Sequence, residues 1–150
     1  MENIDSFEEF LRKKKDEENS NRTDWPARLD KWLESIDVFY MQIREWLTEF
    51  EQEGFLRIVM DKEVNLNEEF VGSYKTKRMD IYIGNDLISI IPKGTLIIGS
   101  YGRLDMRGTK GEILIIQPEW NDWKFAKRTP RLETWDVKAE SFKKILQDLV

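Results

Sequence analysis

The chain has 150 residues, of which 40% are hydrophobic and 12% aromatic, so one domain can form a core without disulfides, metals or lipid. It contains no cysteine and no histidine, which excludes thiol nucleophiles, Ser-His-Asp systems and zinc sites built from the usual nitrogen and sulfur ligands. The net charge is −5, and an acidic chain repels phosphate, so any contact with nucleic acid or an anionic membrane has to be local.

The N-terminal segment, residues 1–22, predicts a short charged helix followed by a linker. Ser6 and Glu9 have the spacing of a capping box. The apolar positions that follow are Phe7, Phe10 and Leu11. The charged run 12–18 leads into Asn19-Ser20-Asn21, where we expect the helix to fray into a solvated segment that attaches loosely to the domain.

A long amphipathic helix is predicted next, starting at Thr23 or Asp24 with Pro26 in its first turn and ending near Gly54. Its apolar positions are Leu29, Ile36, Ile43 and Phe50 at intervals of seven, with Trp32, Phe39, Trp46, Leu33, Tyr40 and Leu47 between them. This stripe is wider than a coiled-coil seam, so we expect it to lie against a sheet and to organise the core. Val38 and Met41 lie on the far side, and the sequence leaves open whether they make a second contact.

From Phe55 onward the hydrophobic period changes to two, which is typical of an antiparallel meander. We predict strands at 55–64, 74–83, 87–92, 95–107 with a kink around Gly99 and Gly102, 112–117 and 123–128. An amphipathic helix over 136–150 closes the chain. The predicted fold is therefore a single α+β domain over residues 1–150, with N-terminal helices packed on a twisted antiparallel meander of about six strands.

Two turns fix the predicted pairing. Gly84-Asn85-Asp86 suits a tight hairpin that places Ile81 and its neighbours opposite Ile88 and Ile90. Gly108-Thr109-Lys110-Gly111 predicts three pairs across the second hairpin. They are Arg107 with Glu112, Met106 with Ile113, and Leu104 with Ile115.

Cationic and aromatic side chains interleave within residues 120–135, a pattern that suits an acidic protein surface or single-stranded nucleic acid. Strand alternation sends Trp123 and Phe125 to the side opposite Lys124 and Arg128, so the rings are equally well explained as core and the cations as a solvated face. The candidate binding residues are Trp120, Trp123, Lys124, Lys127, Arg128 and Arg131, together with Arg103, Asp105 and Arg107 on the outer face of a neighbouring strand.

The remaining catalytic possibilities rest on carboxylates. Asp105 followed by Asp122-Trp123-Lys124 has the spacing by which many nucleases hold magnesium, but Asp122 falls in a predicted turn and no helix follows. A glycosidase-type carboxylate pair cannot be placed from sequence. No phosphate-binding glycine motif occurs. We predict no catalytic residue, no metal ligand and no cofactor.

These observations favour a small non-catalytic binding protein, such as an inhibitor, an immunity-type protein or an accessory subunit, that acts on a protein partner. The alternatives are single-stranded nucleic-acid binding and a metal nuclease. The acidic N-terminus, Met1–Asp5, is unlike a signal peptide and no apolar run could span a bilayer, so we expect a soluble, cytoplasmic protein without membrane contact. The sequence leaves the partner's identity and the oligomeric state open.

Overall fold

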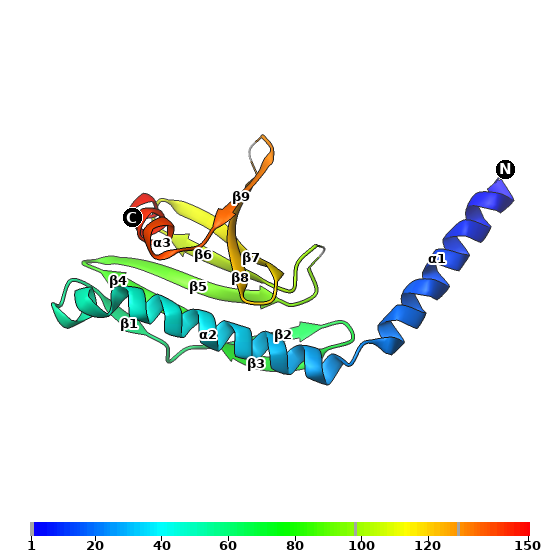
Figure 1. The fold of residues 1–150 in the computed structure, drawn as a ribbon, viewed down its shortest axis with the longest axis horizontal. Helices are drawn as coiled ribbons and strands as arrows, with labels where there is room; N and C mark the ends of the chain where they lie inside the picture. Colours follow the sequence, from blue (N-terminus) through cyan, green and yellow to red (C-terminus); the bar gives the residue numbers. More distant parts are fainter. Residues whose placement is uncertain (1, 98, 129) are drawn as a thin grey trace.

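The fold, seen in a computed structural model that describes residues 2–97, 99–128 and 130–150, belongs to the predicted α+β class (Figure 1). The helices are α1 (Glu2–Arg22), α2 (Trp25–Gln52) and α3 (Ala139–Asp148). The strands are β1 (Arg57–Val59), β2 (Glu63–Glu68), β3 (Gly72–Lys77), β4 (Met79–Ile83), β5 (Asp86–Gly94), β6 (Arg103–Gly108), β7 (Gly111–Glu119), β8 (Asp122–Arg128) and β9 (Leu132–Asp136).

The long helix α2 begins and ends where its sequence signals predict. Asp24 is the N-cap, and its carboxylate accepts a hydrogen bond from the backbone N–H of Ala27 at 3.0 Å. Pro26 lies in the first turn, where a missing N–H leaves no bond unmade. The helix ends at Gln52, and Gly54 then takes a positive φ of 81° that reverses the chain.

Seven strands form one antiparallel sheet in the order β1-β4-β5-β6-β7-β8-β9, and β2 and β3 form a separate hairpin. From β4 to β9 each strand pairs with its neighbour in sequence. The predicted register is confirmed at both turns. The pairs are Ile81 with Ile88, Arg107 with Glu112, Met106 with Ile113, and Leu104 with Ile115.

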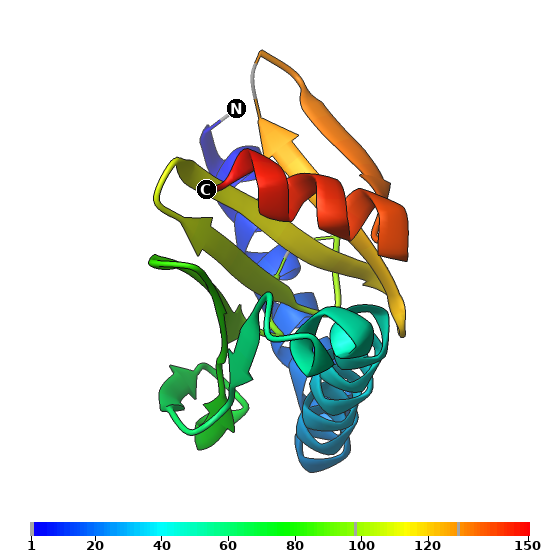
Figure 2. The ribbon, with the colours of Figure 1, turned by 90° about the vertical axis from the view of Figure 1, so that its left-hand side faces the viewer.

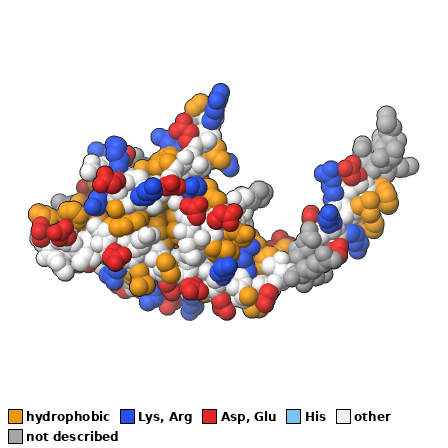
Figure 3. All heavy atoms as spheres, in the orientation of Figure 1, with side chains coloured by type: hydrophobic (Ala, Val, Ile, Leu, Met, Phe, Trp, Pro, Cys, Tyr) orange, Lys and Arg blue, Asp and Glu red, His pale blue; other side chains and the backbone are white. Residues whose placement is uncertain are grey.

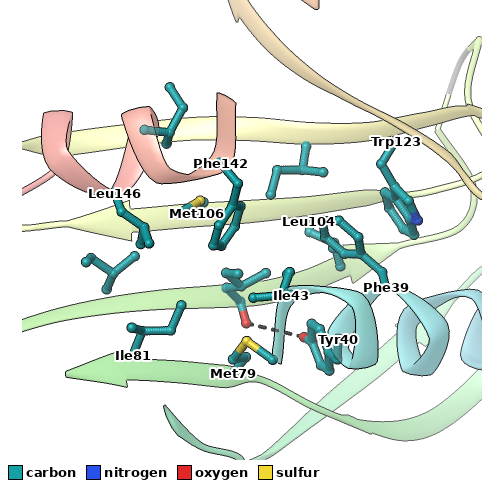
Figure 4. Close-up of a cluster of buried hydrophobic side chains, with 14 of the residues drawn as sticks. Phe39, Tyr40, Ile43, Met79, Ile81, Leu104, Met106, Trp123, Phe142 and Leu146 are labelled. Carbon is teal, nitrogen blue, oxygen red and sulfur yellow. Dashed lines mark hydrogen bonds between the residues drawn. The ribbon is translucent and has the colours of Figure 1, made fainter. Parts of the chain in front are cut away.

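One face of the sheet is covered by α2 and α3, with α3 lying across the strands (Figure 2). Phe39 of α2 stacks on Trp123 of β8 with ring centroids 4.7 Å apart, and Trp46 contacts Phe142 of α3 at 5.8 Å. Trp32 is completely buried. Side chains from both helices and from the inner faces of the strands meet in one core (Figure 4). The expectation that the aromatic helix packs on the sheet is confirmed.

Three predicted strand boundaries are wrong. The segment 55–64 is divided between β1 and the start of β2, and 74–83 is divided between β3 and β4 at Arg78. Residues 95–97 and 99–102 lie outside β5 and β6 and contain one isolated bridge, Ile97 to Ser100, so the predicted strand 95–107 begins only at Arg103. The edge strand β9 was not predicted from the sequence.

The helix α1 extends farther than predicted, because its backbone remains helical through Asn19-Ser20-Asn21 to Arg22. It projects away from the sheet as an arm (Figure 1). Phe7, Phe10 and Leu11 are all exposed on it. Two residues, Thr23 and Asp24, join it to α2.

Candidate functional site

The outer face of the sheet, opposite α2 and α3, collects four of the predicted binding residues. Alternation along β6 points Arg103, Asp105 and Arg107 to this side, and the pairing carries Arg103 through Ile116 of β7 to Lys124 of β8. None of the helices in the described parts of the chain covers this face. The sequence thus correctly placed these side chains on one surface.

The cations of the outer face are already paired within the protein. Arg103 forms two hydrogen bonds to the buried carboxylate of Asp105, at 2.7 and 3.1 Å, and this contact raises the pKa of Arg103. Arg107 lies 2.8 Å from Glu112. Lys124 donates to Asp136, which raises the pKa of Lys124 and lowers that of Asp136. The first pair lies within β6 and the other two join neighbouring strands, so these three cations present little uncompensated positive charge.

The end of the β8–β9 hairpin is different. Lys127, Arg128, Arg131 and Leu132, here called the hairpin patch, are all exposed at the end of a hairpin that extends beyond the two covering helices (Figures 1 and 3). No described carboxylate lies within 4.0 Å of any of the three cations. Leu132 is 60% exposed and sits directly opposite Arg128 in the pairing. The hairpin patch therefore offers positive charge together with an apolar side chain.

The aromatic residues of the 120–135 segment do not join this surface. Trp123 and Phe125 belong to the core, where they are 6% and 0% exposed. Trp120 lies at the opposite end of β8, where it stacks on Tyr101 with centroids 4.6 Å apart. Lys31 and Arg28 lie over its ring, at 5.0 and 5.5 Å from the centroid. The structure thus separates the rings from the hairpin cations that the sequence placed beside them.

The carboxylates of the nuclease hypothesis are also separated. Asp105 aligns with Ala126 of β8, four residues beyond Asp122. This offset is about 13 Å along the strand, with about 10 Å across two strand spacings. Across the described residues, no group of three or more carboxylates converges on a point that could hold a metal ion. Asp105 instead serves as the buried partner of Arg103.

A partly buried polar cluster, which was not predicted from the sequence, joins three distant segments around the buried Thr95. The carboxylate of Glu68, at the end of β2, accepts hydrogen bonds from the backbone N–H groups of Thr95 and Leu96, at 2.9 and 3.0 Å, and from the hydroxyl of Tyr74. Arg28 of α2 donates to the hydroxyl and the carbonyl of Thr95 at 3.0 and 2.8 Å. Burial lowers the pKa of Arg28 and raises that of Tyr74.

The role of this cluster is to hold separate segments of the fold together. Each of its side chains is engaged inside the protein, because Glu68 accepts from three donors and Arg28 donates twice to Thr95. The bonds hold the β2–β3 hairpin and the backbone at Thr95 and Leu96 against α2. Glu68 and Thr95 are 27 residues apart and Arg28 and Thr95 are 67 apart, separations that no local pattern reveals.

Comparison with protein-family models, with curated proteins and with solved structures finds no significant match to this chain. Within the described parts of the chain, every helix is too short or too polar to cross a bilayer.

Proposed function

We propose that this protein is a non-catalytic binding protein whose hairpin patch docks on an acidic surface of a partner protein. The observation that carries the proposal is the contrast between two groups of cations. Arg103, Arg107 and Lys124 on the sheet face each have a carboxylate partner, whereas the three cations of the hairpin patch have none among the described residues. Acidic groups on a partner would complete these pairs and steer the encounter.

Leu132 supports a protein as the occupant. Stable protein interfaces combine an apolar centre with a polar rim, and Leu132 lies beside Arg128 and Arg131 at the end of the hairpin. The proposed role is that of an inhibitor, an immunity-type protein or an accessory subunit that contacts its partner through this projecting hairpin.

The nucleic-acid alternative has less support. Single-stranded nucleic acid is bound by rings that stack on bases beside cations, and the rings nearest the hairpin patch lie in the core or are half-buried. The net charge of −5 also opposes approach of a phosphate backbone.

The test compares two triple charge reversals that change the net charge equally. Lys127→Glu/Arg128→Glu/Arg131→Glu removes the hairpin patch, and Lys13→Glu/Lys93→Glu/Lys110→Glu changes three exposed lysines elsewhere. The probes are an immobilised polyglutamate peptide and a fluorescent single-stranded thymidine oligonucleotide.

We expect salt-sensitive retention on polyglutamate for the parent protein and the lysine control, and loss of retention for the hairpin variant. The thymidine oligonucleotide should not bind even at low salt. Melting temperatures should stay close together, because exposed substitutions change stability by about 0.5 kcal/mol or less. Equal retention of both variants, or binding of the oligonucleotide through the hairpin, would exclude the proposal.

A further inference from the structure

Exposed apolar side chains gather on two adjoining helices. Of the eight large hydrophobic side chains exposed among the described residues, five lie on α1 and α2. They are Phe7 (60% exposed), Phe10 (53%) and Leu11 (49%) on α1, and Val38 (46%) and Met41 (70%) on α2. Val38 and Met41 line a shallow hollow of about 660 Å³ that is formed by the outer side of α2 and by Asn121 of the turn between β7 and β8. In this structure both groups face solvent.

The two groups lie at matching distances from the link between the helices. Phe10 precedes Arg22, the end of α1, by 12 residues, and Val38 follows Trp25, the start of α2, by 13. At 1.5 Å per residue these positions are about 18 and about 20 Å from the link. Phe7 and Met41, at 15 and 16 residues, are about 22 and about 24 Å from it. If α1 were antiparallel to α2, the apolar groups would therefore meet.

In the antiparallel arrangement, a basic residue of α1 would also lie level with acidic residues of α2. Lys14 is on the face of α1 that carries Phe7 and Phe10, and it precedes Arg22 by eight residues. Glu34 follows Trp25 by nine, so the two side chains fall at the same level. Glu34 and Asp37 are exposed on α2, and neither forms an ion pair with another described residue. Lys14 lies 3.7 Å from Glu17 of its own helix, but an exposed pair of this kind contributes little and can be exchanged for a contact with Glu34.

The link itself permits this arrangement. Antiparallel helices are commonly joined by two to five residues, and Thr23 and Asp24 supply two. So short a link keeps α1 at a high effective concentration near its own α2, above that of any second copy. We propose that α1 folds back on the outer side of α2 of the same chain, packing Phe7, Phe10 and Leu11 over Val38 and Met41. This contact lies on α2 and does not depend on the hairpin patch.

Disulfide trapping tests the contact, since the chain has no cysteine of its own. Phe10→Cys/Val38→Cys places one thiol on each helix at the same level, and both sites are exposed, so the fold tolerates the change. The matched control is Phe10→Cys/Phe55→Cys, in which the second exposed site lies beyond the end of α2. Mild oxidation is followed by light scattering and peptide mapping.

We expect the Phe10–Val38 pair to form an intramolecular disulfide in a monomer, at least about tenfold faster than the control pair, as a short tether predicts. A covalent dimer as the main product would assign the hollow to a second copy and overturn the proposal. Equal rates for the two pairs would also overturn it.

Hydrogen exchange supplies a measurement without cysteines. Met41→Asp puts a charge in the hollow, and Phe55→Asp is its control on another exposed side chain. We expect amides of α1 to exchange several-fold faster in Met41→Asp than in the parent, with no change in Phe55→Asp. Unchanged exchange of α1 in Met41→Asp would contradict the contact.

Discussion

Gly102 provides a sensitive test of the core, because Trp32 leaves no room for a side chain there. A Cβ atom at Gly102 would lie 2.0 Å from Cζ3 of Trp32 and 2.5 Å from both Cε3 and Cη2. Carbon atoms pack without strain at about 3.5 to 4.0 Å, so the ring would have to retreat by about 1.5 Å. Trp32 is fully buried, and its Nε1 donates to the hydroxyl of Tyr74 at 3.1 Å. Retreat would disturb both contacts.

Gly102→Ala should therefore destabilise the protein by about 2 to 3 kcal/mol, the upper part of the range for overpacked cores. With a urea dependence of about 2 kcal/mol per M, the unfolding midpoint should fall by about 1 to 1.5 M. Gly102 does not have a left-handed backbone, so alanine meets no conformational penalty that would account for such a loss.

A double-mutant cycle identifies the source of the loss. Trp32→Phe removes the part of the indole that a new methyl group would strike, so Gly102→Ala should cost about 1 to 2 kcal/mol less in the Trp32→Phe background than alone. Urea unfolding followed by circular dichroism gives all four free energies. Additive effects within about 0.5 kcal/mol, or an unchanged midpoint for Gly102→Ala, would refute this account of the packing.

Three further predictions concern buried polar groups. Burial raises the pKa of Tyr40 above the value of about 10 that tyrosine has in the unfolded chain. The stability that Tyr40 contributes is therefore present below that pH and is lost as the pH rises further. Between pH 8 and 10.5, the urea midpoint of Tyr40→Phe should fall less than that of the parent protein. Glu68→Gln should lower stability by about 2 kcal/mol and speed amide exchange at Thr95, because charge-assisted bonds are lost. Asp105→Ala should cost about 2 kcal/mol in urea unfolding, and Arg103→Ala clearly less, because only the aspartate is buried; equal losses would contradict this assignment.

Where local chemistry specifies a structure, the sequence predicted it correctly. The Gly108–Gly111 turn sets the register of β6 and β7, and Asp24 with Pro26 sets the start of α2. The candidate site was predicted in part for the same reason. Strand alternation places Lys124 outward and Trp123 in the core, so period two separates the charged face from the rings.

Long-range contacts explain the rest. Leu96 and Ile97 favour a strand, but Glu68 holds the N–H of Leu96 in a loop, from 28 residues away. β9 is an exposed edge strand with little hydrophobic alternation, so its pairing with β8 left no clear trace in the sequence. Strand pairing decides which cations lie close enough to a carboxylate to form an ion pair. The sequence alone therefore could not predict that Lys124 has a carboxylate partner while the cations of the hairpin patch have none among the described residues.

The order of the strands has a consequence for how the chain folds. From β4 to β9 every pairing joins adjacent segments, so each step closes only a short loop and loses little chain entropy. Before it is complete, the meander would expose the broad hydrophobic inner face of its strands. During synthesis α2 leaves the ribosome before any of these strands, and it is ready to cap that surface as each hairpin is added. Because α2 precedes the strands in the chain, it is available to cover their inner face as soon as each hairpin forms.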